Sequence, residues 1–233
     1  MSCCDSGPSS ILFSLLSRGP PRRLCACASS RPQVWLRSLR SPSASLCACA
    51  PSRSRVFQLA TEELQSSFRF VRSLPSFRSL PVSDQLRLVW AGWARLLVLG
   101  LARVPVLRGI PTQHPGVPGG AAQRLQLVLD MCAGLRTSVR EDAFLRGALL
   151  FTADATELEC GDYIQALQRE AERALYEHVR TIHRDDPARL DELRRVLVTL
   201  RSLEPDTVAG LFFRPVTGPA RVEDHVFAMF FKS

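Results

Sequence analysis

The chain has 233 residues, 46% of them hydrophobic, and a formal net charge of +8 at pH 7. This length fits one large domain with a tail. Residues 1–56 hold eight Arg and one acid, whereas residues 57–233 hold 22 basic and 21 acidic residues. A nearly neutral body argues against a broad face for binding nucleic-acid phosphates. No uninterrupted apolar stretch is long enough to span a bilayer, so no membrane contact is expected.

The first 55 residues are rich in Ser, Arg, Pro and Cys without sustained periodicity, so we predict a disordered tail over 1–55. Six of the eight cysteines lie there, as adjacent residues or C-x-C pairs, and C-x-x-C occurs nowhere in the chain. Because thiolates one residue apart do not readily occupy two corners of a tetrahedral site, we expect no zinc and no cofactor. The Arg-rich, acid-poor composition also fits a mitochondrial transit peptide.

One apolar island interrupts the tail, where Leu12, Leu15 and Leu16 form the pattern L-x-x-L-L. On a helical turn these side chains share one face, because positions i, i+3 and i+4 are neighbours. Such a face suits a hydrophobic groove on a partner. Burying three leucines contributes roughly 5–9 kcal/mol gross. Ordering the segment on binding costs about 2–5 kcal/mol of this free energy, so we predict a modest, reversible contact.

The body begins with two predicted helices separated by prolines. Helical spacing of apolar residues predicts one helix over 56–74 and a second over 83–103. Proline follows both Leu74 and Leu80 and breaks the pattern there. Ser83 is expected to cap the second helix, with Asp84 in its first turn. This helix is apolar on nearly every face, which predicts a central position in an all-helical domain.

A Pro- and Gly-rich loop over 104–120 precedes the remaining predicted elements. Ser138 and Glu141 form a capping box at the start of one of them. Four leucines are spaced three, four and three residues apart: Leu190, Leu193, Leu197 and Leu200. They form an apolar stripe, the leucine seam, that faces either the core or a partner helix. The predicted helices cover 121–137, 139–151, 157–184, a segment opening at 186–187, and 222–231.

A run of matched positions lies where the first two helices meet. These positions are Phe70, Arg72, Leu74, Pro75, Phe77, Leu80, Pro81, Asp84, Gln85, Leu88, Ala91, Gly92 and Trp93. Their spacing resembles the signature of nuclear receptor ligand-binding domains, and a run this long is specific. The resemblance implies an all-α fold, a three-layer antiparallel helical sandwich, over residues 56–233.

The rest of the chain resembles atypical members of that family. The two four-cysteine zinc sites of the family's DNA-binding domain are not expected, since C-x-x-C is missing, and sequence-specific DNA binding is not expected either. A receptor-like domain with an N-terminal leucine box resembles orphan receptors that lack a DNA-binding domain. The resemblance implies a transcriptional co-repressor, nuclear and also cytoplasmic. It would bind other nuclear receptors through the box, block coactivators and recruit co-repressor proteins in bile acid and cholesterol metabolism.

The same resemblance places a coactivator groove between the first two helices and the last. The matching positions are Val71, Arg72, Gln85, Val89, Val226, Met229 and Phe230. In the family, a basic residue and a glutamate of the last helix clamp the two ends of a bound peptide. Here the basic half is Arg72, but the acidic half falls on Ala228. We therefore hypothesise that this domain does not hold a coactivator peptide in the ordinary way.

Motifs for catalysis are missing from the sequence. His178 and His183 lie five residues apart and so point to different faces of one helix, which fails H-E-x-x-H. No G-x-S-x-G elbow occurs, and the glycines of 116–120 lack the Lys-Ser/Thr of a phosphate loop. We therefore expect that the chain is not an enzyme. Two alternatives stay open: a ligand-regulated orphan receptor with a working pocket, whose ligand is unknown, and a mitochondrially targeted helical protein.

Overall fold

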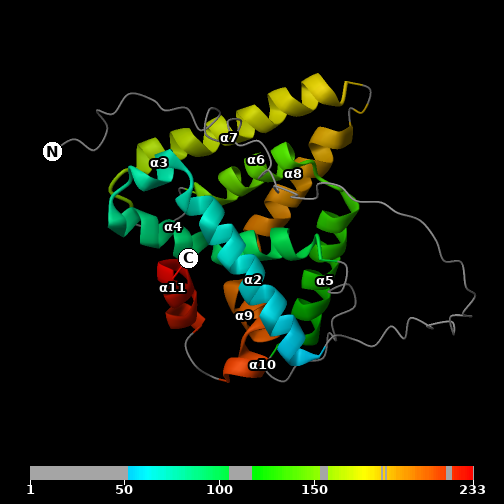
Figure 1. Cartoon of the computed structure of the whole chain (residues 1–233). Helices are drawn as coiled ribbons and strands as arrows, with labels where there is room; N and C mark the ends of the chain where they lie inside the picture. The colour runs from blue at the N-terminus through cyan, green and yellow to red at the C-terminus, as the bar shows by residue number, and fades with distance from the viewer. Residues whose placement is uncertain are drawn as a thin grey trace, which may run out of the picture.

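The computed structural model describes residues 52–104, 117–152, 157–184, 186, 188–218 and 222–232 (Figure 1). The leucine box at Leu12, Leu15 and Leu16 and most of the predicted tail lie outside these ranges. All elements within them are helices. They are α2 (Arg53–Arg72), α3 (Pro75–Arg78), α4 (Val82–Leu101), α5 (Gly119–Gly134), α6 (Val139–Leu150), α7 (Gly161–Ile182), α8 (Ala188–Arg201), α9 (Pro205–Phe212), α10 (Arg214–Thr217) and α11 (Val222–Lys232).

The central helix is α4, as its all-round apolar sequence predicts. It packs against α2 on one side and α6 on the other, and it also contacts α5, α8, α9 and α11. α6 in turn packs along α7 (Figure 1). Trp93 in α4 is 1% exposed, and its neighbours Leu96 and Leu97 are fully buried. The predicted all-α, three-layer antiparallel helical sandwich is confirmed.

Two glycines of α4 face its neighbours, and a side chain would be tolerated differently at each. A Cβ at Gly92 would lie 3.6 Å from the backbone oxygen of Leu149 in α6, an ordinary contact distance. A Cβ at Gly100 would instead overlap the carboxylate of Glu63 in α2. A side chain at position 100 would therefore force the Glu63 side chain to shift.

Helix starts differ from the predictions by a few residues, for local reasons. α2 starts at Arg53, where the Ser52 hydroxyl accepts a hydrogen bond from the Arg55 amide at 3.3 Å. The prediction that Ser83 caps α4 is wrong, because the helix starts at Val82 and Pro81 precedes it. The capping box of α6 is confirmed by reciprocal bonds between Ser138 and Glu141.

The long helix α7 is shorter than the predicted 157–184. Glu157 has a φ of 65°, which no helical residue adopts, so the helix starts only at Gly161. At the other end, the apolar spacing of the helix predicts that Ile182 faces inward, but it does not. Ile182 is 59% exposed, and Val179 is the last buried residue of the helix.

The leucine seam of α8 faces the interior. Leu193, Leu197 and Leu200 are each at most 4% exposed and belong to the core, and Leu190 packs partly buried against it. Of the two arrangements that the spacing allows, the structure therefore favours core packing over a partner helix. Within the described residues, no helix combines the length and the apolarity that crossing a membrane requires.

Candidate functional site: the surface covered by the last helix

The last helix, α11, lies across α2 and α4 (Figure 1). Its apolar stripe faces these helices, since Val226, Met229 and Phe230 are 0%, 5% and 4% exposed. These residues are spaced i, i+3 and i+4, so they share one face of the helix. All three belong to the predicted groove. They do not line an open rim, because their side chains are buried against the rest of the domain.

Phe230 of α11 contacts side chains of both α2 and α3. Its ring lies edge-to-face with Phe68 of α2, 5.5 Å between centroids, and with Phe77 of α3 at 6.3 Å. The guanidinium carbon of Arg72 lies 4.7 Å from the centre of the same ring. Aromatic pairs of this geometry and a cation over a ring face are both stabilising. Arg72, the predicted basic half of a peptide clamp, is thus engaged with the chain's own last helix.

Further aromatic contacts hold α11 along its length. Phe227 stacks on Trp90 of α4, with 5.8 Å between centroids. His225 lies 5.7 Å from Phe57 of α2 and 5.8 Å from Phe213. Burial lowers the pKa of His225, and the charge of nearby Lys232 lowers it further. The imidazole therefore favours its neutral form in this aromatic setting.

The remaining predicted groove residues have internal partners. Val71 and Val89 are fully buried. The side-chain amide of Gln85 donates to the backbone oxygen of Leu80 at 2.8 Å, which closes the turn between α3 and α4. Ala228, the predicted position of an acidic clamp residue, is exposed and lies between half-buried Phe227 and buried Met229.

Asp84 has a role that the sequence does not suggest. Its carboxylate is fully buried and accepts hydrogen bonds from the backbone amides of Glu159 and Cys160, each at 2.9 Å. These amides precede α7, so a residue in the first turn of α4 fixes the start of a helix 75 residues further on. Asp84 thus joins two layers of the fold.

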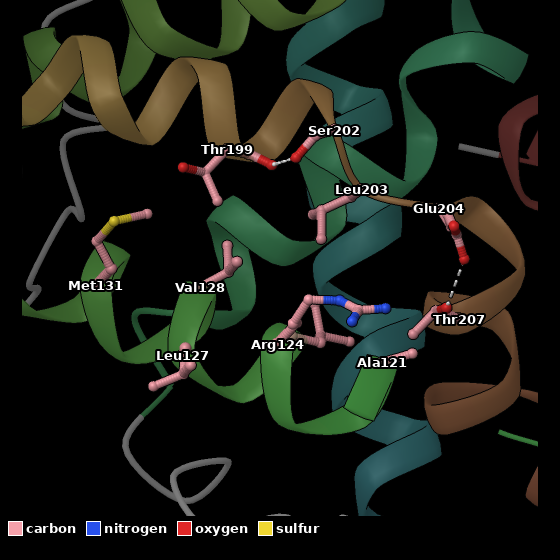
Figure 2. Close-up of a pocket in the computed structure, with 11 residues that line it drawn as sticks. Ala121, Arg124, Leu127, Val128, Met131, Thr199, Ser202, Leu203, Glu204 and Thr207 are labelled. Atoms are coloured by element: carbon pink, nitrogen blue, oxygen red, sulfur yellow. Dashed lines mark hydrogen bonds between the residues drawn. The ribbon is translucent and has the colours of Figure 1, made fainter. Parts of the chain in front are cut away.

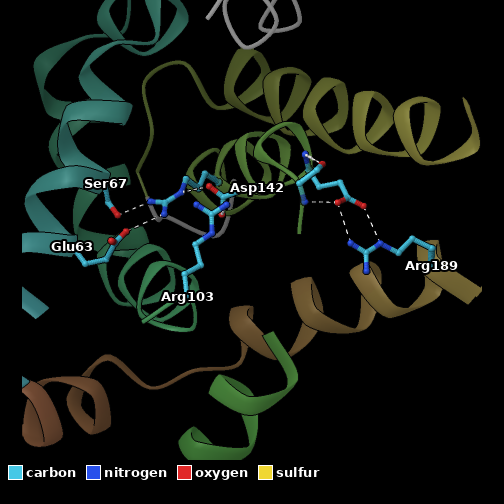
Figure 3. Close-up of polar contacts among 8 residues, drawn as sticks. Glu63, Ser67, Arg103, Asp142 and Arg189 are labelled. Carbon is cyan, nitrogen blue, oxygen red and sulfur yellow. Dashed lines mark hydrogen bonds and ion pairs between the residues drawn. The ribbon is translucent and has the colours of Figure 1, made fainter. Parts of the chain in front are cut away.

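A buried ionic cluster, also missed by sequence reasoning, joins α2 to α6 (Figure 3). Arg146 donates to Asp142 at 2.9 Å, to Glu63 at 3.0 Å and to Ser67 at 2.6 Å. Burial works to lower the pKa of Arg146, but its attraction to Asp142 and Glu63 outweighs this and raises the pKa above its ordinary value. Arg103, just beyond α4, pairs with the same Asp142 at 3.2 Å. The sequence around Arg146 gives no local signal of such a cluster, because Glu63 and Ser67 lie about 80 residues earlier in the chain.

A cleft of about 290 Å³ lies between α5, α8 and the start of α9 (Figure 2). Arg124, Val128 and Met131 of α5 form one wall, and Thr199 and Leu203 lie opposite. The volume is at the lower end for small-molecule sites. The described residues bring together no group of three or more His, Cys, Asp or Glu side chains suited to a metal ion.

A family model and a set of curated relatives both place the chain in one family. Residues 52–107 match the family model for the ligand-binding domain of nuclear hormone receptors. The chain is 32% identical over 212 residues to the nuclear receptor subfamily 0 group B member 1 of Callithrix jacchus and of Homo sapiens, and 31% identical to that of Mus musculus. Each alignment covers 75% of this chain and 45% of the relative. The chain spans about half the length of the curated relatives that it matches.

Proposed function

This chain belongs to the nuclear receptor ligand-binding domain family, and on that premise we propose that it is a transcriptional co-repressor. It acts in the nucleus through contacts with other nuclear receptors and with co-repressor proteins. It does not read DNA sequence itself and catalyses no reaction. The relatives in subfamily 0 group B support this proposal through their similarity across most of the chain.

The proposed contact uses the leucine box. Leu12, Leu15 and Leu16 dock into the coactivator groove of an activated receptor, and coactivators are then excluded from that groove. Ordering the box on binding costs free energy, so the complex is reversible. The chain therefore displaces coactivators only when its concentration is high enough to compete with them. The co-repressor proteins that the domain recruits then act on the occupied receptor.

One observation carries the proposal: α11 and Arg72 are already engaged with each other. The clamp position that would need an acid holds Ala228. A domain whose basic clamp residue is stacked on its own last helix is poorly suited to receive a coactivator. This arrangement supports a protein that inserts its own leucine box into a partner's groove, rather than one that binds a partner's leucine box in a groove of its own.

A pull-down with full-length chain and activated receptor domains tests the proposal. Leu15→Ala with Leu16→Ala should abolish capture, whereas Leu24→Ala with Leu46→Ala, two tail leucines outside the box, should leave it unchanged. Circular dichroism checks that both variants keep the helical domain. Receptor capture that persists after Leu15→Ala with Leu16→Ala would contradict the leucine-box mechanism.

A ligand-regulated receptor is the second candidate, favoured by the cleft between α5 and α8. A volume of about 290 Å³ suits only a small apolar ligand. Thermal stabilisation by a panel of small apolar compounds would support it. Imaging the tagged full chain separates both candidates from a mitochondrial protein, because only the latter would co-localise with mitochondria.

A further inference from the structure

We propose that the cleft between α5, α8 and the start of α9 binds a small apolar molecule that carries one carboxylate, such as a medium-chain fatty acid. The inference rests on the second candidate function and deepens it, because it names the ligand class of the same cleft. The described residues that line the cleft come from α5, α8, α9 and the turn between the last two helices. The cleft is therefore separate from the surface that α11 covers.

The inner surface of the cleft is apolar. Leu125 and Val128 of α5 are 1% and 6% exposed, and both line the cleft. Met131 and Leu203 are partly buried and pack against the core beside them. An aliphatic chain that enters the cleft is therefore removed from water, which favours binding. A volume of about 290 Å³ suits a short chain.

Arg124 brings a positive charge to this apolar space. Its guanidinium points into the cleft, toward Thr207 and Glu204 (Figure 2). Among the described residues, Arg124 has neither a hydrogen-bond partner nor an ion-pair partner. A guanidinium is always charged and offers five N–H donors in a planar fork. This fork matches the two oxygens of a carboxylate, so Arg124 is suited to hold the charged end of a ligand.

The hydroxyl groups of the cleft already use their donor hydrogens within the chain. Thr199 and Ser202 each donate to a backbone oxygen about one turn earlier, at 2.8 and 2.9 Å. Thr207 donates to the carboxylate of Glu204 at 3.4 Å (Figure 2). The side-chain donors that remain for a ligand are those of Arg124. The ligand must therefore present an acceptor at this point, and an anionic acceptor gives the stronger hydrogen bond.

Glu204 works against an anionic ligand, because its carboxylate lines the same cleft. The side chain is exposed and already accepts the hydrogen bond from Thr207, so water screens part of its charge. A ligand carboxylate beside Arg124 is thus attracted by one side chain and repelled by another. Removing the charge of Glu204 should tighten binding of the anion, which provides a test in the opposite direction to removal of Arg124.

Isothermal titration calorimetry of the full chain with octanoate and with 1-octanol tests the proposal. The two compounds share their apolar chain, but only octanoate is charged. Octanoate should bind more tightly by about threefold or more. Arg124→Gln should remove this advantage without changing the affinity for octanol, and Glu204→Gln should tighten binding of octanoate alone. Arg69→Gln, at an exposed arginine of α2 outside the cleft, is the matched control and should change neither affinity.

Filling the cleft tests the position of the ligand. Thr199→Phe adds a ring to one wall and should weaken the binding of both compounds. Thr181→Phe in α7 is the matched control and should leave binding unchanged, because both threonine hydroxyls bond the backbone oxygen four residues earlier. Circular dichroism checks that both variants keep the helical domain. If Thr199→Phe does not fold, the Arg124→Gln comparison still decides.

Three results would overturn the proposal. Octanoate that binds no more tightly than octanol, or that binds Arg124→Gln as it binds the parent, excludes a carboxylate site at Arg124 but leaves the second candidate function standing. Binding that is unchanged in folded Thr199→Phe places the ligand elsewhere. No binding of either compound contradicts both the proposal and the second candidate function. The pull-down with partner receptors is independent of all three.

Discussion

The guanidinium carbon of Arg72 lies 4.7 Å from the centre of the Phe230 ring. One residue ends α2 and the other lies near the end of α11, 158 positions later in the chain. A cation over an aromatic face is attracted by the ring's quadrupole, most strongly where water is partly excluded. This contact joins the end of α2 to the last helix of the chain.

Arg72→Ala should loosen α11 without unfolding the domain. A partly exposed cation–π contact contributes about 0.5–2 kcal/mol, so the free energy of unfolding should fall by that amount. Hydrogen exchange should show the loss of protection concentrated in 222–232. Arg69→Ala, an exposed arginine three residues earlier, is the matched control and should change neither quantity. Equal effects of the two substitutions would contradict a specific role for Arg72.

Gly100→Ala should destabilise the crossing of α2 and α4. The added Cβ would overlap the Glu63 carboxylate, so the Glu63 side chain must shift and its bond to Arg146 is strained or lost. Overpacking of this kind costs about 1–3 kcal/mol. Gly134→Ala is the matched control, because a Cβ at this helical position meets nothing within 4 Å. It should leave stability unchanged or raise it by up to about 1 kcal/mol. Urea unfolding of both variants measures the difference.

The helices and the central layer could be predicted from the sequence because their signals are local. Apolar spacing within α2 and α4 and the capping box at Ser138 each depend on neighbours a few residues away. The predicted helix ends were wrong where the backbone conformation of a single residue set the boundary. The positive φ of Glu157 delays the start of α7, and no pattern of side chains encodes it.

The roles of single polar residues could not be predicted, because their partners lie far along the chain. Asp84 bonds amides 75 and 76 residues away, and Arg146 bonds Glu63 at a separation of 83. The residues of the predicted groove come from the family resemblance and stay a prediction. That Phe230 packs between Phe68 and Phe77 depends on where the last helix docks, which is a tertiary property.

Asp84→Asn should weaken the link between α4 and α7. The aspartate accepts one backbone bond on each oxygen, whereas an asparagine amide presents a nitrogen to one of these donors. Leaving a buried donor unsatisfied costs about 1–3 kcal/mol. Ser83→Ala, at the neighbouring position, should cost less. Unfolding by urea compares the two, and the amides of 159–161 should exchange faster only in the Asp84 variant.

Stability should fall on mild acidification because of two histidines. Burial lowers the pKa of His178 and of His225 in the folded state. The unfolded chain then binds more protons just below the ordinary histidine pKa of about 6.5, so stability is lost as pH drops through that range toward the folded pKa values. The free energy of unfolding should be lower at about pH 5.5 than at about pH 7.5. His178→Gln with His225→Gln should reduce this difference, and an unchanged difference would exclude these groups as its source.

Arg146→Met should destabilise the domain more than any of the preceding substitutions. Methionine fills much of the volume of the arginine side chain but donates no hydrogen bond. Glu63 and Ser67 would therefore lose their donor, whereas Asp142 would keep Arg103 as its partner. Breaking a buried ion pair on one side costs about 3–5 kcal/mol, measurable by urea unfolding.

The exposed pair of Arg173 with Glu177 provides the control for Arg146. These side chains are also 3.0 Å apart, but they are 74% and 55% exposed. Arg173→Met should therefore cost less than about 0.5 kcal/mol. Adding Glu63→Gln and Asp142→Asn to Arg146→Met should recover part of the loss, because the uncompensated charges are then removed. No recovery would mean that lost packing at position 146, rather than charge, dominates the cost.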